Sequence, residues 1–400
     1  MPASWRRWGE CWGEDDVPAF PNYDPELIAA LDAQADAILG VFASAGYTRH
    51  EPSILQPADI FLDRSGEEIR RRTFELTDPS GRELCLRPDL TIPTCKWQVD
   101  TAQTYPARLC YHGPAFRHQP SEPHRPTQFY QAGLELLGLE DRAAADIETM
   151  RLTVEAVRAA GLNAFEMKIG DLGLFAALVD GLDVPVQWRG RLKRHFWRTG
   201  YFEALLQRMT VGAANDSQRL LAHLGGLAPA EARVAVEGLL DMVGEAPLGA
   251  RTREEIVERL IEQAADAAAL RLDSKVAQVI DEMLNVSGPA PDALKRIRAL
   301  SPALDAPLEA MQARLDALAS LGIDPACATF AARFGRNMEY YTGFVFELWS
   351  RDAEGPVQIA GGGRYDGLLE ALGAGRPIPA IGSAIRTERV LAARRAAGRA

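Results

Sequence analysis

Lysine and cysteine are scarce in this chain of 400 residues, and cations are outnumbered. Against 55 aspartates and glutamates stand 44 lysines and arginines, which gives a formal net charge of −11 at pH 7. Proteins that bind nucleic-acid backbones concentrate cations, so this balance argues against a nucleic-acid partner. Arginine supplies almost every cation, and guanidinium groups suit the recognition of carboxylates or phosphates. The five lysines are Lys96, Lys168, Lys193, Lys275 and Lys295.

The five cysteines are odd in number, scattered, and never form a C-x-x-C pair. This distribution predicts neither a disulfide framework nor a zinc site, and it is typical of a reducing cytoplasm. The first twenty residues include Glu10 and Glu14 but no apolar core, so we expect no secretory signal. No run reaches about 18 uninterrupted apolar residues, so we also expect no membrane span.

Several common catalytic signatures are missing as well. The chain has no G-x-S-x-G, Walker A or Rossmann glycine pattern, which argues against the frequent nucleophile and nucleotide sites. His112, His118 and His124 fall six residues apart, a spacing that no standard zinc pattern uses. We therefore expect neither a metal nor a cofactor.

The chain has three stretches that differ in composition and in hydrophobic periodicity. Residues 1–173 combine a helical pattern at 24–46 with strand-like segments, and residues 322–400 return to strands. Between them, residues 174–321 show helical periodicity almost throughout, which predicts a helical insertion. Strands on both sides of a helical block indicate one α+β domain that is interrupted in sequence and completed by the C-terminal segment.

Turn residues place the predicted strands. We expect a β-hairpin over residues 73–87, because Asp78-Pro79-Ser80-Gly81 separates two strand-like runs. The other predicted elements are strands at 108–112, 127–137, 328–334 and 343–349, a helix at 143–160, a glycine-dense turn at 361–363 and a helix after Pro379.

The segment 128–135 carries the first candidate site. On a strand, Gln131, Gly133 and Glu135 share one face, so two polar side chains flank a position without a side chain. That arrangement leaves floor space for a small ligand, and the carboxylate can accept a hydrogen bond from a ring or amine N–H. The alternative is the exposed polar face of an edge strand.

Asp89 and Thr91 repeat the i, i+2 arrangement on another segment. A carboxylate beside a hydroxyl suits an ammonium group. An aspartate that follows a proline is equally an ordinary helix cap, and the pattern alone leaves both interpretations open.

Two arginines are candidates for binding a carboxylate. Arg117 follows Phe116 at the end of a predicted strand, and Arg336 precedes the phenols of Tyr340 and Tyr341. A guanidinium group that faces a cleft binds a carboxylate through two hydrogen bonds. The commoner role of a single arginine is a surface ion pair.

Together these segments resemble the catalytic core of class II aminoacyl-tRNA synthetases, specifically histidyl-tRNA synthetase. The resemblance extends over residues 24–395 and implies an antiparallel sheet flanked by helices, with a helical insertion. It also implies a dimer formed through residues 47–63. The matching segments are 86–91 (L-R-P-D-L-T), 113–118 (G-P-A-F-R-H), 128–135 (Q-F-Y-Q-A-G-L-E), 336–341 with 346–347, and 362–367 (G-G-R-Y-D-G).

By that resemblance, the roles of a histidine pocket transfer to matching positions. Asp89, Thr91 and Gln131 would hold the α-amino group. Glu135 and Tyr341 would meet the two imidazole nitrogens, because a neutral imidazole offers one donor and one acceptor. The remaining members are Arg117 for the carboxylate, Arg336 at the position of the family's catalytic arginine, and Tyr340.

The departures from the synthetase pattern concern the nucleotide and the tRNA. Gln119 stands where the synthetases carry the glutamate that meets the adenine amino group. Arg386 replaces the second glycine of the third motif, so its side chain should obstruct the close approach of a nucleotide. The sequence ends soon after that motif, and we expect no anticodon-binding domain.

A core that keeps the histidine pocket but loses nucleotide contacts resembles the regulatory subunits of ATP phosphoribosyltransferase. That resemblance implies a non-catalytic cytoplasmic subunit that joins the short-form catalytic subunit in a hetero-octamer. The assembly performs the first step of L-histidine biosynthesis, with L-histidine as feedback effector and with neither nucleic acid nor membrane as a partner. The alternatives are a histidine-activating enzyme, which the retained Arg117, Arg336 and Arg389 favour, and a free-standing histidine-binding module.

Overall fold

The structure of the chain is a computed structural model, and it forms two compact units. The first, called the sheet unit, comprises residues 1–174, 286–298 and 305–400, and the second, called the helical unit, comprises 175–285 and 299–304. The described residues are 23–62, 70–118, 126–184, 186–196, 199–211, 216–243, 253–268, 272–334, 340–353 and 355–398.

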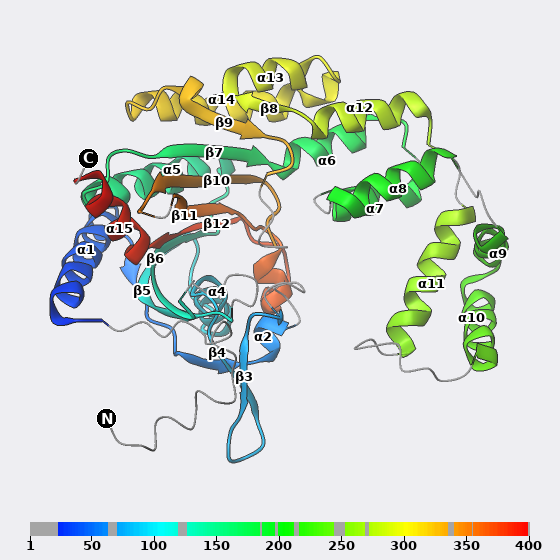
Figure 1. The fold of residues 1–400 in the computed structure, drawn as a ribbon, viewed down its shortest axis with the longest axis horizontal. Coiled ribbons are helices and arrows are strands. Elements are labelled where there is room, and N and C mark those ends of the chain that lie inside the picture. Colours follow the sequence, from blue (N-terminus) through cyan, green and yellow to red (C-terminus); the bar gives the residue numbers. More distant parts are fainter. Residues whose placement is uncertain are drawn as a thin grey trace. The chain divides into compact units, whose positions relative to one another are not determined.

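A nine-stranded sheet lies at the centre of the sheet unit (Figure 1). Its strands are β1 (Thr48–Arg49), β5 (Ala107–Phe116), β6 (Gln128–Leu137), β7 (Glu166–Asp171), β8 (Ser287–Pro289), β9 (Ala328–Ala331), β10 (Phe344–Arg351), β11 (Pro356–Arg364) and β12 (Ala380–Arg386). They follow the order β1-β5-β6-β12-β11-β10-β7-β9-β8. Neighbours are antiparallel except for the pairs β1·β5 and β7·β9. The predicted α+β class with a class II synthetase-like antiparallel sheet is confirmed.

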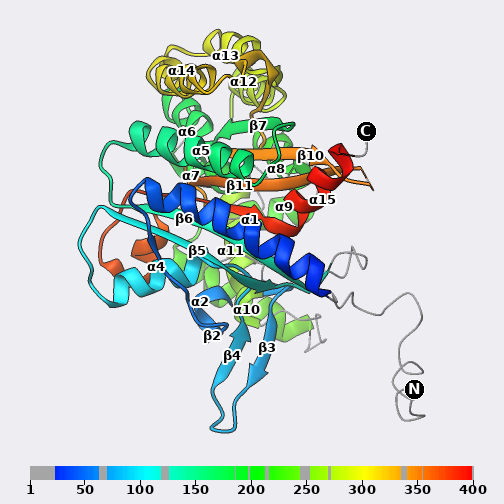
Figure 2. The same ribbon diagram turned by 90° about the vertical axis from the view of Figure 1, so that its left-hand side faces the viewer.

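Three helices cover one face of this sheet: α1 (Pro25–Ser44), α5 (Arg142–Ala159) and α15 (Thr387–Ala397) (Figure 2). The sequence starts α1 locally, because the Asp24 carboxylate accepts a hydrogen bond from the Leu27 backbone N–H at 2.7 Å. Its apolar stripe, which includes Ile38 and Phe42, is fully buried. The predicted helices at 24–46 and 143–160 are confirmed.

Helix α1 is also the one helix among the described residues that is long and apolar enough to cross a membrane, by length and composition only. Its buried Leu31, Ile38 and Phe42 belong to the core. The side chain of Gln34 is buried and donates a hydrogen bond to the Thr387 carbonyl at 2.7 Å. These contacts are those of a core helix.

A small sheet packs against the opposite face, in the order β2-β4-β3. It contains the predicted hairpin, which is confirmed. Its buried Cys85 joins a core cluster with Ile92 and Cys95, which lie on a neighbouring helix. The elements of this region are β2 (Leu55–Pro57), α2 (Asp59–Leu62), β3 (Phe74–Thr77), β4 (Glu83–Leu86), α4 (Thr91–Asp100) and the single π turn η4 (Glu370–Ala374).

Two predicted elements near the C-terminus are wrong. Residues 361–363 form no turn but lie inside β11, where a Cβ at Gly362 would come 2.5 Å from the Gly382 carbonyl oxygen. Glycine is needed there because neighbouring strands approach closely, not because the chain reverses. The segment after Pro379 is also not a helix at first, since β12 intervenes and α15 begins at Thr387.

The helical unit is built almost wholly from helices, as the helical periodicity of its sequence predicts. α9, α10 and α11 pack around Leu224, Val236 and Val257. The contacts give this unit a shorter range than the predicted insertion at 174–321, because α13 and α14 pack on β8, β9 and α5 of the sheet unit. The helices of the region are α6 (Leu172–Gly181), α7 (Val186–His195), α8 (Thr199–Val211), α9 (Asp216–Gly225), α10 (Pro229–Val243), α11 (Arg253–Ala268), α12 (Ser274–Leu284), α13 (Ala290–Arg298), η2 (Pro302–Leu304), α14 (Asp305–Ser320) and η3 (Pro325–Cys327).

A buried ion network ties β11 to α5 and α14. The Asp146 carboxylate is fully buried and accepts hydrogen bonds from the Arg314 and Arg364 Nε atoms, each at 2.9 Å. Both arginines are also buried. Arg364 further donates to Asp366 at 2.8 Å, so the residues on both sides of Tyr365 are held in place.

Candidate functional site

The predicted site lies on the sheet face opposite α5. Ser383 of β12 pairs with Leu134 of β6, and its hydroxyl is 2.6 Å from that of Thr153 on α5, so the even-numbered residues of β6 face the helices. Gln131 and Glu135 therefore face the other way, toward α4 and the small sheet. Since β6 is an interior strand and both side chains are buried, the alternative of an exposed edge strand is wrong.

Glu135 is the fully buried centre of this site. The Tyr111 hydroxyl donates to Glu135 Oε1 at 3.0 Å, and the Tyr365 hydroxyl donates to Oε2. The Thr91 hydroxyl lies 3.2 Å from that of Tyr111 and extends the chain of polar contacts. Burial raises the pKa of Glu135 to about 7, although the hydroxyl hydrogen bonds pull it down.

Glycines around Glu135 make room for side chains rather than for a ligand. The expectation of free floor space at Gly133 is wrong, because a Cβ there would come 2.6 Å from the Tyr111 ring. On the next strand, a Cβ at Gly382 would come 1.7 Å from Glu135 Oε2. One strand further, a Cβ at Gly363 would lie 2.9 Å from Tyr341 Cε1. The glycines of β6, β11 and β12 thus make room for the rings of Tyr111 and Tyr341 and for the Glu135 carboxylate.

Asp89 acts as a helix cap with one oxygen and leaves the other without a partner. Its Oδ1 accepts a hydrogen bond from the Ile92 backbone N–H at 3.0 Å, at the start of α4. Its Oδ2 is buried and has no hydrogen-bond partner, and the same holds for Gln131 Oε1. Burial raises the pKa of Asp89, while the nearby Arg117 lowers it. Two buried acceptors without donors are what an ammonium group would satisfy.

The arginine side of the site is centred on the buried ring of Phe129. Arg117 Nε donates to the Pro88 carbonyl at 2.7 Å, next to Asp89, and its Cζ lies 5.5 Å from the ring centroid. Arg386 lies closer, with Cζ at 4.2 Å from the same centroid. The Arg386 guanidinium group thus occupies one face of the Phe129 ring, and its obstruction of a nucleotide stays a prediction.

Tyr340 and Tyr341 form a cluster of aromatic rings with Tyr365, which donates to Glu135. The Tyr340 ring centroid lies 5.2 Å from that of Tyr341 and 5.6 Å from that of Tyr365, both in edge-on contact. Burial raises the pKa of Tyr341, and the carboxylate of Glu135 raises it further. Both tyrosines remain neutral donors at physiological pH.

Seven of the eight predicted pocket residues come together on this face, and the eighth, Arg336, lies outside the described residues, as does Gln119. The predicted set missed Tyr111 and Tyr365, which hold the central carboxylate. Tyr365 belongs to the G-G-R-Y-D-G segment, so its sequence context carried a signal. Tyr111 could be found only from its position opposite Gly133, and that position is known only when the pairing of β5 with β6 is known.

The pH dependence of stability tests the state of Glu135. Folding raises the pKa of this carboxyl from 4.5 to about 7, so the folded chain holds the proton more tightly than the unfolded chain. Its contribution to stability is complete below pH 4.5 and is lost as the pH rises through about 7, by about 3 kcal/mol in total. Urea unfolding across this range should show that slope, and Glu135→Gln should remove it. A slope that persists in the variant would belong to another group.

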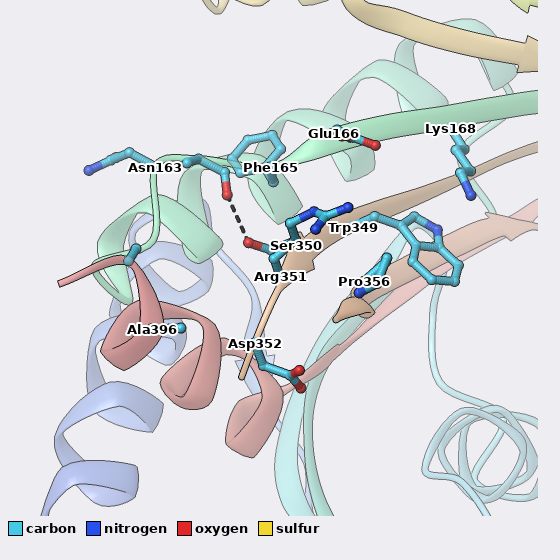
Figure 3. Close-up of a pocket in the computed structure, with 12 residues that line it drawn as sticks. Asn163, Phe165, Glu166, Lys168, Trp349, Ser350, Arg351, Asp352, Pro356 and Ala396 are labelled. Carbon is cyan, nitrogen blue, oxygen red and sulfur yellow. Dashed lines mark hydrogen bonds between the residues drawn. The ribbon is translucent and has the colours of Figure 1, made fainter. Parts of the chain in front are cut away.

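A second cavity, of about 720 Å³, lies at another end of the main sheet and contains none of the predicted site residues (Figure 3). The Lys168 ammonium lies 4.2 Å from the Trp349 ring centroid, and the Trp349 indole N–H donates to Glu347 at 2.8 Å. The Ser350 hydroxyl donates to the Ala164 carbonyl at 3.0 Å. The Ser350 hydroxyl and the Trp349 indole N–H thus have partners within the protein.

Comparison with known proteins agrees with the fold. The family described as Histidyl-tRNA synthetase matches residues 20–235 and 218–390. An ATP phosphoribosyltransferase regulatory subunit from Agrobacterium fabrum is 35% identical over 90% of this chain and 96% of its own length. One of the same name from Brucella anthropi is 36% identical over 85% and 91%. A crystal structure titled ATP phosphoribosyltransferase regulatory subunit/histidyl-tRNA synthetase, from Bacillus halodurans, covers 96% of this chain and 83% of its own, with a TM-score of 0.65 and 23% identity.

The family match and the nine-stranded, mainly antiparallel sheet thus define a histidyl-tRNA synthetase-like core. Within that class, the identities to curated relatives are decisive, because they extend over nearly the whole length of both chains. The chain belongs to the family of ATP phosphoribosyltransferase regulatory subunits, and its role is that of a non-catalytic subunit.

Proposed function

We propose that this chain is the regulatory partner of a short-form ATP phosphoribosyltransferase catalytic subunit, and that it senses L-histidine. The two proteins would form a hetero-octamer in the cytoplasm and perform the first step of histidine biosynthesis under feedback control. The observation that carries the proposal is a buried carboxylate beside two buried acceptors without partners, with the Arg386 guanidinium group nearby on the Phe129 ring. Glu135 and Gln131 are buried in the pocket, while Arg386 lies against Phe129.

Each polar part of histidine has a matching group in the pocket. The ammonium group would donate to Asp89 Oδ2 and Gln131 Oε1, two buried acceptors of this site that have no partner. An imidazole N–H would donate to Glu135 in place of one of the tyrosine hydroxyls, and the Tyr341 hydroxyl would meet the other ring nitrogen. Because the carboxylate must be ionised to accept fully, binding should strengthen as the pH rises through the pKa of Glu135, about 7.

The outward face of the small sheet supports self-association. Cys85 points inward and is fully buried, so the alternate residues of the three strands face outward. Leu55 is 47% exposed and Leu76 is 38% exposed. A contiguous apolar face with exposed leucines is typical of a surface that another protein covers. A second copy of this chain would cover this face, which includes part of the predicted dimer segment 47–63, and we expect a dimer by sedimentation. The members of this face are Leu55, Pro57, Phe74, Leu76, Leu84 and Leu86.

Pyrophosphate exchange separates regulation from amino-acid activation. If Arg386 blocks the nucleotide, the chain supplied with ATP and histidine should catalyse no exchange above background, while an authentic histidyl-tRNA synthetase serves as the positive control. Added to the short-form catalytic subunit, the chain should raise phosphoribosyl transfer and make it sensitive to histidine. Robust exchange by the purified chain, or no effect on the catalytic subunit, would overturn the proposal.

A further inference from the structure

Arg386 is a charged side chain at the edge of the proposed histidine pocket that has no role in the pocket as proposed above. It ends β12 and pairs in register with Gln131 of β6, so the two side chains project from the same sheet face as cross-strand neighbours. Gln131 carries one of the two buried acceptors of this site that have no partner. Arg386 is therefore placed beside the position proposed for the α-amino group.

The guanidinium group of Arg386 has its hydrogen-bonding capacity unused. Across the part of the chain that the structure describes, it contacts the Phe129 ring and makes no hydrogen bond. Burial lowers its pKa, and the neighbouring cations Arg117 and Arg389 lower it further. The nearby Glu388 offers little relief, because its Oε1 accepts the Tyr130 backbone N–H at 2.7 Å. A planar fork of five N–H donors among other cations is a receptor for an anion.

The position of Asp89 indicates which anion. Its carboxylate is close enough for both Arg117 and Arg386 to lower its pKa. A ligand that satisfies Asp89 with a cation and Arg386 with an anion must carry both charges close together. An α-amino acid has its ammonium and carboxylate groups on one carbon atom, whereas a phosphate supplies only the anion.

We propose that Arg386 binds the α-carboxylate of the amino-acid effector, together with Arg117, and that it selects ligands with a free carboxylate. This inference rests on the proposed histidine pocket. It assigns the arginine a positive role in binding, beyond obstruction of the nucleotide. Held between two guanidinium groups, the carboxylate is retained as a recognition group instead of being presented to a nucleotide.

Histidine and histidinol, in which a hydroxymethyl group replaces the carboxylate, provide the test. The full chain should bind histidine more tightly than histidinol by calorimetry at pH 8. Arg386→Gln should reduce that preference about ten- to a hundredfold while leaving histidinol affinity unchanged, because only the charge-assisted contact is lost. Arg395→Gln, at an exposed position on α15, is the matched control and should keep the preference.

The possible outcomes separate the two claims. Failure of the unaltered chain to bind either ligand would contradict the histidine pocket itself. Binding of histidine with an unchanged preference in Arg386→Gln would overturn the role of Arg386 and leave the pocket intact. Arg386→Met, which keeps apolar contact with Phe129, repeats the test if the glutamine variant does not fold, and it should show the same loss of preference.

Discussion

Replacing Asp146 by asparagine is expected to lower the free energy of unfolding by about 3–5 kcal/mol. The carboxylate is fully buried between Arg314 and Arg364, which are 6% and 5% exposed. Asparagine keeps the volume but removes the carboxylate that both buried guanidinium groups share, which leaves Arg364 only Asp366 and Arg314 only Asp171, at 3.6 Å, as counter-charges among the described residues. The asparagine N–H groups would also face the N–H donors of an arginine. Urea unfolding of the full chain measures the difference.

The control for this variant is a more exposed pair on the same helix. Arg151 donates to Glu155 at 2.8 Å on α5, with side chains 40% and 36% exposed. Glu155→Gln should cost less than about 1 kcal/mol, because solvent screens such pairs. If Asp146→Asn is as mild as this control, the buried network contributes nothing to the stability of the sheet unit.

Replacing Glu135 by alanine is expected to weaken histidine binding about ten- to a hundredfold. The substitution removes the charged acceptor proposed for the imidazole N–H and leaves the hydroxyls of Tyr111 and Tyr365 to face each other. Calorimetry with the isolated chain measures the affinity. In the complex with the catalytic subunit, the histidine concentration that gives half inhibition should rise in the same proportion.

Glu140→Ala is the matched control, because Glu140 is exposed and follows the same strand. Thermal unfolding of both variants distinguishes loss of a contact from loss of the fold, and Glu135→Gln provides an isosteric second variant. Unchanged inhibition in the Glu135→Ala complex would place the effector elsewhere, for example between unlike subunits.

Helix α1 and the hairpin β3–β4 follow local rules, since a capping aspartate, an apolar stripe and a turn cluster are visible in a short window. The prediction for residues 361–363 is wrong because a run of glycines is required either where the chain reverses or where strands pack closely. Only the strand pairing in the sheet distinguishes these two cases. The order of strands in the sheet is likewise set by pairings between distant segments.

The candidate site divides in the same way. The sequence leaves Asp89 open to two interpretations, a helix cap and an ammonium site. Its Oδ1 caps α4, and its Oδ2 is buried without a hydrogen-bond partner, so the ammonium site stays a prediction. Tyr111 could not be found from spacing, because its contact with Glu135 depends on the register of β5 against β6. The contact of Arg386 with Phe129 likewise depends on the pairing of two distant strands. The neighbouring residues Tyr130 and Thr387, which are in contact, are 257 residues apart in the sequence.

The pocket is also connected to the rest of the sheet unit. Tyr365, which donates to Glu135, lies between Arg364 and Asp366, and Arg364 belongs to the buried network around Asp146. A ligand that displaces the Tyr365 hydroxyl would change the groups next to that network. For a regulatory subunit, effector binding must differ in free energy between two states of the assembly, and this connection offers one place for that difference.

Calorimetric titration of L-histidine tests the central claim most directly, first into the isolated chain and then into its complex with the short-form catalytic subunit. Histidine should bind both samples at one site per chain of this protein, and Glu135→Ala should weaken that binding about ten- to a hundredfold. Binding that is absent from the isolated chain, or an affinity that Glu135→Ala leaves unchanged in the complex, would contradict a histidine-sensing pocket at Glu135.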